Sequence, residues 1–257
     1  MSEERIYEAP ETTEEVVAEE VCMDWSGYGK SMLSVFGNWR YSLSITEMDD
    51  TSITGHLEVS YLYEVAHDTT FAGEGTIEGD TVRYHIIFDT LIDEKYFVFD
   101  DLNGDYTEID LYYDKNTDEF SFKNTYYNVV MTNDLTQEKN SDLLAENRKW
   151  KGEGEDSLCA LSPAGHLFEV DIEKMTETKV NGTLKVFNGE TLEHESTFAG
   201  RGYNEEGIVY FEVKLDTPRT EEFFLVHTEE KFVMTYNCET EELTVSSYYS
   251  FTGQPVK

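Results

Sequence analysis

The sequence contains little cysteine, little proline and little positive charge. Among 257 residues there are three Cys, four Pro and 19 Lys and Arg. The cysteines are odd in number and far apart, so they predict neither a disulfide framework nor a metal cluster: Cys22, Cys159 and Cys238. We interpret all three as free thiols, which are usual in the cytosol.

The excess of acidic residues argues against several classes of partner. With 54 Asp and Glu, the formal net charge is −35. Because phosphate groups are neutralised by Lys and Arg, this charge predicts that the protein binds neither nucleic acid nor an anionic membrane. The chain is nevertheless 39% hydrophobic and 14% aromatic, which is enough to build a packed core.

Long apolar segments are also missing. No apolar run approaches the roughly 18 residues that are needed to span a bilayer. The acidic start, Met1 to Glu4, lacks the positive and apolar regions of a signal peptide. We therefore expect a cytoplasmic protein.

The chain contains a long internal repeat. The motif Trp-x-Gly-x-Gly at 25–29 recurs at 150–154, an offset of 125. The segment HDTTFAGEG at 67–75 recurs as HESTFAGRG at 194–202, an offset of 127. A repeat of this length is too long for a solenoid unit and indicates a small domain present in two copies.

The repeat divides the chain into four parts. We expect an acidic tail, disordered or partly helical, over residues 1–22 and the first domain over 23–133. A linker follows over 134–147, and the second domain covers 148–257. Within the linker, Ser141 predicts the N-cap of a short helix.

Apolar residues in both copies alternate with a period of two, which is typical of strands. Turn signals separate about eight such runs in each copy: Glu78-Gly79-Asp80, Asn103-Gly104-Asp105, Asn181-Gly182 and Asn188-Gly189. Because a sheet with this many strands must protect its edges, we predict an all-β fold. It consists of two tandem eight-stranded antiparallel up-and-down barrels with a short helical linker. A β-sandwich is the main alternative.

The Trp-x-Gly-x-Gly motif resembles the opening strand of calycin-type barrels, the group of lipocalins, fatty-acid-binding proteins and nitrobindin-like proteins. The segment 149–155 is most similar to the nitrobindin-type start, in which an early Trp plugs the barrel end. His194 to Phe198 is similar to the middle strand of that group. The resemblance implies a small-molecule pocket inside each barrel.

The same resemblance bears on cofactors. Nitrobindin-like proteins bind haem through a His near the C-terminal end of the barrel. Neither copy here has a His in its last two strands, so we expect no haem and no other cofactor. His and Cys do not cluster at metal-ligand spacing, and Asp100 to Asp105 does not fit an EF-hand, so we predict no metal site.

Seven residues are candidate ligand contacts. Tyr84, Tyr113 and Tyr236 fall on the inward phase, where a phenol binds a ligand or, alternatively, serves as an amphipathic core residue. The remaining candidates are paired across the copies: His67 and His194, Trp25 and Trp150. The histidines are either polar groups at a barrel mouth or exposed residues that begin a strand. The tryptophans are either binding residues or plugs.

The basic residues of the strands fall on the outward-facing positions, which limits the chemical class of ligand that we expect. Arg83, Arg201 and Lys214 all point away from the barrel interior in this interpretation. A buried carboxylate would therefore lack a cationic partner, which costs several kcal/mol. We predict a small neutral ligand of apolar or aromatic character.

These observations favour a non-catalytic small-molecule binding protein. One alternative is a structural or protein-interaction module with filled barrels, which would use outward aromatic residues: Phe97, Tyr112, Tyr126, Phe224 and Tyr249. A second alternative is a cyclase or isomerase that acts through pocket shape, although no inward acid or base is evident for it. Gly-x-Ser-x-Gly, a phosphate loop and a dinucleotide fingerprint are all missing.

Overall fold

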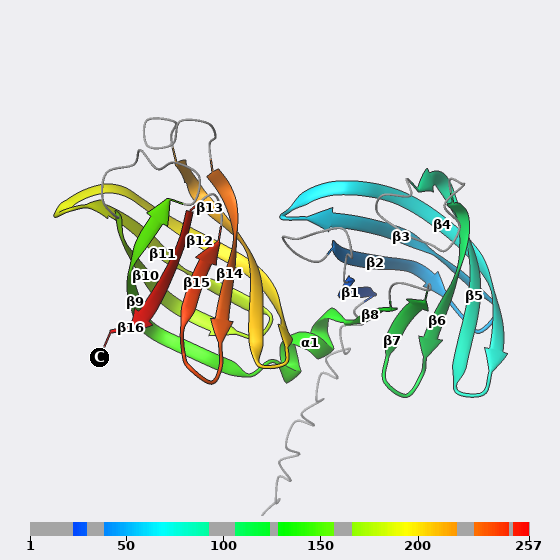
Figure 1. Cartoon of the computed structure of the whole chain (residues 1–257). Coiled ribbons are helices and arrows are strands. Elements are labelled where there is room, and N and C mark those ends of the chain that lie inside the picture. The colour runs from blue at the N-terminus through cyan, green and yellow to red at the C-terminus, as the bar shows by residue number, and fades with distance from the viewer. Residues whose placement is uncertain are drawn as a thin grey trace, which may run out of the picture.

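A computed structural model shows two closed eight-stranded antiparallel barrels (Figure 1). The structure describes residues 23–29, 39–92, 106–123, 128–156, 166–219, 229–246 and 249–256. The predicted tail, Cys22, Cys159, the segment Asp100 to Asp105 and three of the candidate surface aromatics lie outside these residues: Phe97, Tyr126 and Phe224. The prediction of tandem up-and-down barrels is confirmed, and the sandwich alternative is wrong.

The first barrel runs in chain order from β1 to β8. Pairing of β1 with β8, Trp25 opposite Asn133 and Ser26 opposite Thr132, closes it. Its strands are β1 (Asp24–Gly29), β2 (Trp39–Met48), β3 (Ser52–Tyr61), β4 (Glu64–Glu78), β5 (Thr81–Ile92), β6 (Tyr106–Asp114), β7 (Glu119–Lys123) and β8 (Asn128–Asn133).

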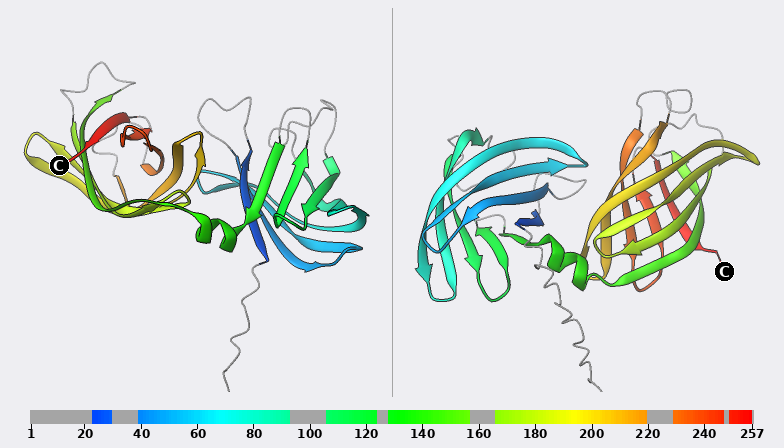
Figure 2. Two further views of the ribbon diagram at one scale, coloured as in Figure 1. Left: turned by 90° about the horizontal axis from the view of Figure 1, so that it is seen from below. Right: turned by 180° about the vertical axis from the view of Figure 1, so that it is seen from behind.

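The second barrel repeats this order and closes where β16 pairs with β9. Its strands are β9 (Leu143–Asp156), β10 (His166–Thr176), β11 (Lys179–Asn188), β12 (Thr191–Glu205), β13 (Ile208–Arg219), β14 (Glu229–Asn237), β15 (Leu243–Ser246) and β16 (Tyr249–Pro255). The helix α1 (Asp134–Asn140) lies between the two barrels in both views of Figure 2. Among the described residues, no helix combines the length and the apolar character that crossing a membrane requires.

The position of α1 corrects one prediction. Ser141 does not begin the helix, because Asn133 is the N-cap and its side chain accepts a hydrogen bond from the Leu135 amide at 3.2 Å. Ser141 stands at the opposite end, in an extended conformation, and β9 begins at Leu143 inside the predicted linker. Asn and Ser are both favourable N-cap residues, so residue type alone does not decide which of the two caps the helix. The N-cap is Asn133 because β8 ends there.

The alternation of apolar residues places one continuous apolar cluster inside each barrel. Val82, Tyr84 and Ile86 are each at most 1% exposed, while His85 between them is exposed. Gly79 and Gly189 have positive φ values of 71° and 60°, which confirms two of the predicted turns. Asn181-Gly182 is not a turn but lies within β11, where Gly182 faces the backbone of Asp171 too closely for a side chain.

The Trp-x-Gly motif has a structural cause in both barrels. A Cβ at Gly27 would overlap the carbonyl oxygen of Val130 across the β1–β8 closure. A Cβ at Gly152 would overlap the carbonyl oxygen of Thr252 across the β9–β16 closure. The motif therefore marks the place where the first and last strands of each barrel come together.

Candidate functional site

In the first barrel, two of the predicted aromatic residues meet at the turn between β6 and β7. The Trp25 indole donates to the backbone oxygen of Asp118 at 3.1 Å and to its Oδ1 at 3.2 Å. The Tyr113 hydroxyl donates to the same Oδ1 at 3.0 Å, and the two rings meet edge to face at 6.4 Å. Asp118 has a positive φ of 55°. We call this arrangement the barrel floor.

The second barrel has an equivalent floor. The Trp150 indole donates to the backbone oxygen of Glu241 at 2.9 Å, and Tyr236 meets the indole edge to face at 6.1 Å. Glu241 has a φ of 58°, and its carboxylate accepts two hydrogen bonds from the Arg148 guanidinium at 2.8 and 2.5 Å. In each barrel, a tryptophan and a tyrosine that were predicted separately as site residues therefore lie together.

Tyr84 also belongs to the floor of the first barrel. Its hydroxyl donates to the backbone oxygen of Asp49, in the turn between β2 and β3, at 2.7 Å. Burial raises the pKa of Tyr84 to about 12 and likewise that of Tyr113 to about 12. Both phenols thus stay neutral and use their protons to fasten turns. Ligand binding by these residues stays a prediction.

The two histidines lie elsewhere in the barrels. His67 is opposite Val59, and His194 occupies the same place opposite Val186. Each is the fourth residue of its strand and is half-buried, with a buried Nε2 atom, so neither is an exposed residue that begins a strand. The inward-facing Phe71 and Phe198 follow four residues later in each strand. The structure does not bring the histidines to the floor residues.

Aromatic rings take up interior space where the walls carry glycine. A Cβ at Gly55 would stand 2.9 Å from the Phe71 ring, and one at Gly202 would stand 2.5 Å from the Phe211 ring. The last two strands of each barrel, β7–β8 and β15–β16, contain no His in their sequence. The residues present therefore do not fit a haem held from those strands. Among the described residues, no group of three or more His, Cys, Asp or Glu is placed to hold a metal ion.

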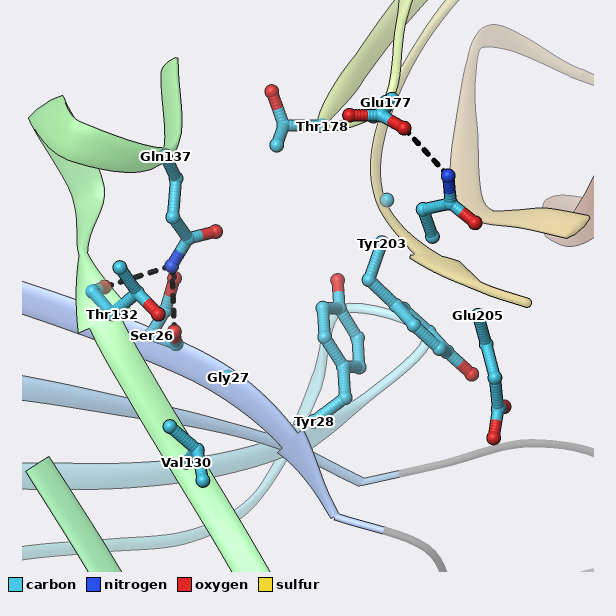
Figure 3. Close-up of a pocket in the computed structure, with 12 residues that line it drawn as sticks. Ser26, Gly27, Tyr28, Val130, Thr132, Gln137, Glu177, Thr178, Tyr203 and Glu205 are labelled. Carbon is cyan, nitrogen blue, oxygen red and sulfur yellow. Dashed lines mark hydrogen bonds between the residues drawn. The ribbon is translucent and has the colours of Figure 1, made fainter. Parts of the chain in front are cut away.

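A pocket lies between the two barrels, with a volume of about 390 Å³ (Figure 3). None of the seven predicted site residues lines it. Its walls come from β1, β8 and α1 on one side and from the β10–β11 turn and β12 on the other. The lining residues are Ser26, Gly27, Tyr28, Val130, Thr132, Gln137, Glu177, Thr178, Gly202, Tyr203, Asn204 and Glu205.

A stack of tyrosine rings joins the barrels at the edge of this pocket. Tyr28 from the first barrel stacks on Tyr203 from the second, with ring centroids 4.2 Å apart and planes inclined by 30°. Tyr203 stacks in turn on Tyr210 at 5.3 Å. In Figure 3, Tyr28 stands between Tyr203 on one side and Val130 and Gln137 on the other. The side of Tyr28 away from Tyr203 therefore faces the pocket.

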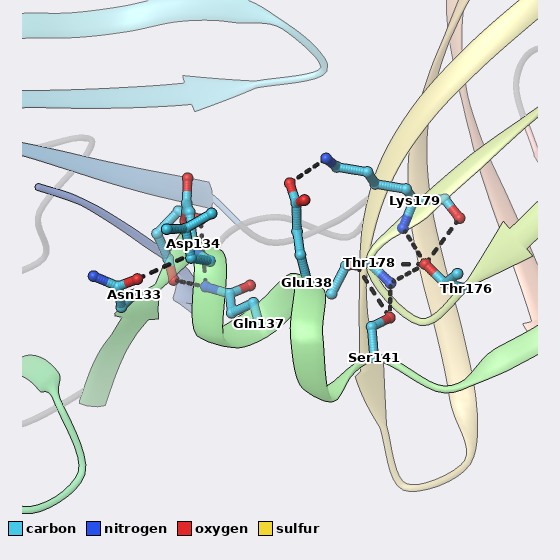
Figure 4. A network of polar contacts seen from close by, with 10 residues as sticks. Asn133, Asp134, Gln137, Glu138, Ser141, Thr176, Thr178 and Lys179 are labelled. Atoms are coloured by element: carbon cyan, nitrogen blue, oxygen red, sulfur yellow. Dashed lines mark hydrogen bonds and ion pairs between the residues drawn. The ribbon is translucent and has the colours of Figure 1, made fainter. Parts of the chain in front are cut away.

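The helix α1 holds polar groups around the pocket (Figure 4). The Gln137 side-chain amide donates to the backbone oxygens of Ser26 at 2.7 Å and Thr132 at 2.8 Å. At the other end of the helix, the Ser141 hydroxyl accepts from the Thr178 amide at 3.2 Å. Glu138 forms an ion pair with Lys179 of the second barrel. One short helix thus contacts the adjoining strands of both barrels.

A partly buried ion pair lies where the second barrel contacts the first. Arg201 pairs with the Glu212 carboxylate at 2.9 Å, and its guanidinium lies over the Tyr63 ring at 4.3 Å and donates to the Ser60 hydroxyl at 3.1 Å. Glu212 accepts from the Leu62 amide at 2.8 Å, and its backbone oxygen accepts from the Tyr63 hydroxyl at 3.1 Å. We call this set of contacts the Glu212 clamp. These contacts bind the second barrel to the β3–β4 turn of the first barrel.

The Tyr28 hydroxyl lies buried near this clamp. It makes no hydrogen bond with any residue that the structure describes. Burial and the charge of Glu212 raise the pKa of Tyr28 far above its usual value, so the phenol stays protonated. A buried donor without an acceptor costs free energy, so this interface is not fully optimised.

The pocket residues were missed because they differ between the copies. At the repeat offsets, Tyr28 corresponds to Glu153, and Tyr203 corresponds to Thr76. Arg201 and Glu212 of the clamp correspond to Glu74 and His85. The sequence signal that marks the site is departure from the repeat, whereas the predictions followed residues that the copies share.

Comparisons with known proteins give no relative: the chain matches no protein-family model, no curated protein and no solved structure. The class of protein is therefore defined by the fold and the site. It is a tandem of two closed eight-stranded antiparallel barrels, docked through a polar clamp, with an open pocket between them.

Proposed function

We propose that this is a non-catalytic small-molecule binding protein whose ligand site is the pocket between the barrels. The observation that carries the proposal is the pocket itself. Its volume of about 390 Å³ falls within the range of ligand sites, roughly 300–1,000 Å³, and both barrels contribute to its walls. A stacked tyrosine forms an apolar wall, and amides, hydroxyls and carboxylates supply the few polar groups that orient a ligand.

This proposal moves the expected site from the barrel interiors to their junction. The interiors hold packed apolar clusters, and two of the three phenols predicted as ligand contacts, Tyr84 and Tyr113, donate hydrogen bonds to turns. We further propose that the barrels are of the calycin type. The support is the Trp-x-Gly motif, which in each copy supplies the floor tryptophan and the closure glycine.

The residue types in the pocket favour binding over catalysis. His, Cys and Lys are missing from the described lining, and these are common nucleophiles and general bases. Ser26 donates its hydroxyl proton to the Asp134 carboxylate at 2.6 Å, at the start of α1. That contact ties the helix to β1 and includes no imidazole that would activate the serine.

Native mass spectrometry of the protein purified from its natural host tests the proposal. We expect a bound molecule on the wild-type protein and on Ile87→Trp, a change at a 54% exposed position on the outer wall of β5. Val130→Trp, at a 39% exposed position in the pocket wall, fills the site and removes the adduct. An adduct that survives Val130→Trp, or a wild-type protein without any adduct, contradicts the proposal.

The interaction-module alternative stays a prediction. Filled barrel interiors are the observation that favours it. Of the outward aromatics named for it, only Tyr112 has a described side chain, and that side chain is half-buried. Wild-type protein without an adduct would favour this alternative.

A further inference from the structure

Four residues of the pocket lining have side-chain donors that are already bonded within the protein. Both protons of the Gln137 amide are used, in hydrogen bonds to the backbone oxygens of Ser26 and Thr132. The hydroxyls donate in the same way: Ser26 to Asp134 at 2.6 Å, Thr132 to Glu119 at 3.4 Å and Thr178 to Ser141 at 3.1 Å. A ligand acceptor would bind to these groups only by breaking one of these bonds.

The acceptor oxygen of Gln137, by contrast, is aimed into the pocket. The hydrogen bonds of this side chain to described residues all leave from its nitrogen, which is turned toward Ser26 and Thr132. The amide oxygen therefore points the other way, toward the side on which Tyr28 lies (Figure 3). Figure 4 shows the same oxygen directed toward the second barrel. Two hydrogen bonds thus hold an acceptor in place at the pocket wall.

Glu177 supplies a second acceptor from the other barrel. Its Oε1 accepts from the Asn204 side-chain amide at 2.5 Å, which fixes the orientation of the carboxylate. Its other oxygen points away from Asn204, toward Thr178 (Figure 3). Among the described residues, this Oε2 accepts a single long hydrogen bond, from the Asp142 backbone amide at 3.4 Å. A carboxylate oxygen has room for a second donor, so Oε2 is available to a ligand.

An aromatic face lies in the same pocket. Tyr203 covers one side of the Tyr28 ring, and the other side faces Val130 and Gln137 (Figure 3). A flat ring laid on this open side would extend the stack that already includes Tyr28 and Tyr203. The Glu205 carboxylate lies beyond Tyr203 in the same view, so it takes no part in this arrangement.

Charges of opposite sign balance around Tyr28. Arg40 of β2 pairs in register with Tyr28, and its guanidinium bonds to a neighbouring serine hydroxyl. Burial raises the pKa of the Tyr28 phenol most, the charge of Glu212 raises it further, and Arg40 and Arg201 lower it. Together with the Glu177 carboxylate, these groups are two cations and two anions. The site therefore gives no strong preference to a charged ligand.

We propose that the pocket binds a flat, uncharged aromatic ring that carries N–H donors on its edge. The ring stacks on the open face of Tyr28 beside Val130, and its N–H groups donate to Glu177 Oε2 and Gln137 Oε1. Hydrogen bonds to a carboxylate are stronger than neutral ones, so the Glu177 contact contributes most to the affinity. A ring that offers only acceptors is disfavoured, because the donors named above are already bonded. This inference rests on the proposed function, since it names the ligand class of the same pocket.

Indole and benzofuran test the inference, because the two molecules have the same shape and no charge. Indole carries an N–H donor where benzofuran carries an acceptor oxygen. Backbone amide shifts in NMR spectra of the full chain report where each probe binds and how tightly. We expect both probes to shift Tyr28, Thr178 and Tyr203, with indole bound about fivefold more tightly, the usual contribution of one hydrogen bond. Tryptamine, which adds a cationic chain to indole, should bind no more tightly than indole.

Variants of the two acceptors test the hydrogen bonds. In Glu177→Gln the side-chain oxygen stays with Asn204 and an NH2 group replaces Oε2, so the preference for indole should fall to about twofold or less. In the double variant with Gln137→Leu the preference should vanish. Because Gln137 also fastens α1, the affinity for benzofuran shows whether the pocket is intact. Glu190→Gln, in the exposed β11–β12 turn, should change neither affinity.

Variants of Tyr28 test the aromatic face. Tyr28→Phe keeps the ring and removes a hydroxyl that bonds to no described residue, so both probes should bind as they do to the wild-type protein. Tyr28→Leu removes the ring and should weaken both probes about fivefold.

The outcomes distinguish this inference from the proposed function. Equal affinity for indole and benzofuran in the wild-type protein, a preference that persists in the double variant, tighter binding of tryptamine than of indole, or no indole shift at these residues overturns the inference. If the native adduct is still lost in Val130→Trp, the proposed function stands without it. If the adduct survives Val130→Trp, the proposed function fails whatever the probes do.

Discussion

The two barrels are alike at their floors and closures but differ on the outer surfaces that meet. In each barrel, a tryptophan indole donates a hydrogen bond to the backbone carbonyl of a turn residue with positive φ. Each barrel also has a glycine where its first and last strands pair. By contrast, Glu212 of the second barrel corresponds to His85 of the first, and Tyr28 of the first corresponds to Glu153 of the second. Barrel closure constrains the interior of both copies, while the outer faces have become complementary. The pocket is a product of that difference and belongs to neither barrel alone.

The largest effect should come from removing what the barrels share. Trp25→Ala and Trp150→Ala each delete a buried indole that plugs a floor, so each should lower the free energy of unfolding by about 3–5 kcal/mol. Urea unfolding measures both. The two variants should cost similar amounts, and a loss below about 1 kcal/mol in either would show that its floor is not structural.

The next largest effect should come from the Glu212 clamp, which the first barrel lacks at the equivalent positions. Glu212→Gln removes the buried charge that pairs with Arg201. We expect it to weaken the docking of the two barrels by about 2 kcal/mol. This is less than the loss of a fully buried ion pair would cost, because Arg201 is partly exposed and water solvates its charge. His85→Gln, the matched change on the exposed equivalent position, should have almost no effect. Small-angle X-ray scattering should show a larger maximum dimension for Glu212→Gln only. Equal behaviour of the two variants would contradict the asymmetric clamp.

An effect of similar size is expected at the closures. Gly27→Ala and Gly152→Ala push a methyl group against a backbone carbonyl, so each should destabilise the protein by about 1–3 kcal/mol. Gly79→Asn is the control, because Gly79 has open space around it and Asn tolerates its φ of 71°. Thermal unfolding in which the control loses as much as the closure variants would argue against the steric account.

The smallest effect is a dependence on alkaline pH. Tyr84 and Tyr113 have folded pKa values of about 12, above the usual value of 10.0, so the folded state holds these protons more tightly than the unfolded state. Their contribution to stability is complete below pH 10 and is lost as the pH rises toward 12. Tyr84→Phe and Tyr113→Phe should therefore flatten the decline in stability between these values. Phenolate absorbance during titration checks the pKa values, and ionisation of both groups near pH 10 would refute the assignment.

The fold was predictable because its signals are local and occur in both copies. A period of two, turn residues such as Gly79 and Gly189, and repeat offsets of 125 and 127 were enough to indicate two barrels. Tyr84 was correctly assigned to the inward face, yet the partner of its hydroxyl is Asp49, 35 residues earlier in the chain. Such a partner follows from barrel closure and not from the residues beside Tyr84.

The pocket was not predictable for a related reason. Tyr28 and Tyr203 come from strands of different barrels, and no periodicity within either copy encodes how two outer faces will dock. The helix α1 and its end at Ser141 contact both barrels, and the expected cap at Ser141 misplaced that helix. Comparing the copies position by position for mismatches would have drawn attention to Tyr28, Arg201 and Glu212.

The central claim is that the ligand site lies between the barrels. A crystal structure of the protein purified from its natural host, with its bound molecule retained, tests it most directly. We predict electron density for that molecule in contact with Tyr28 and Tyr203, bounded by Val130 and Glu177. Density inside either barrel, beside Tyr84 or Tyr236, would contradict the account.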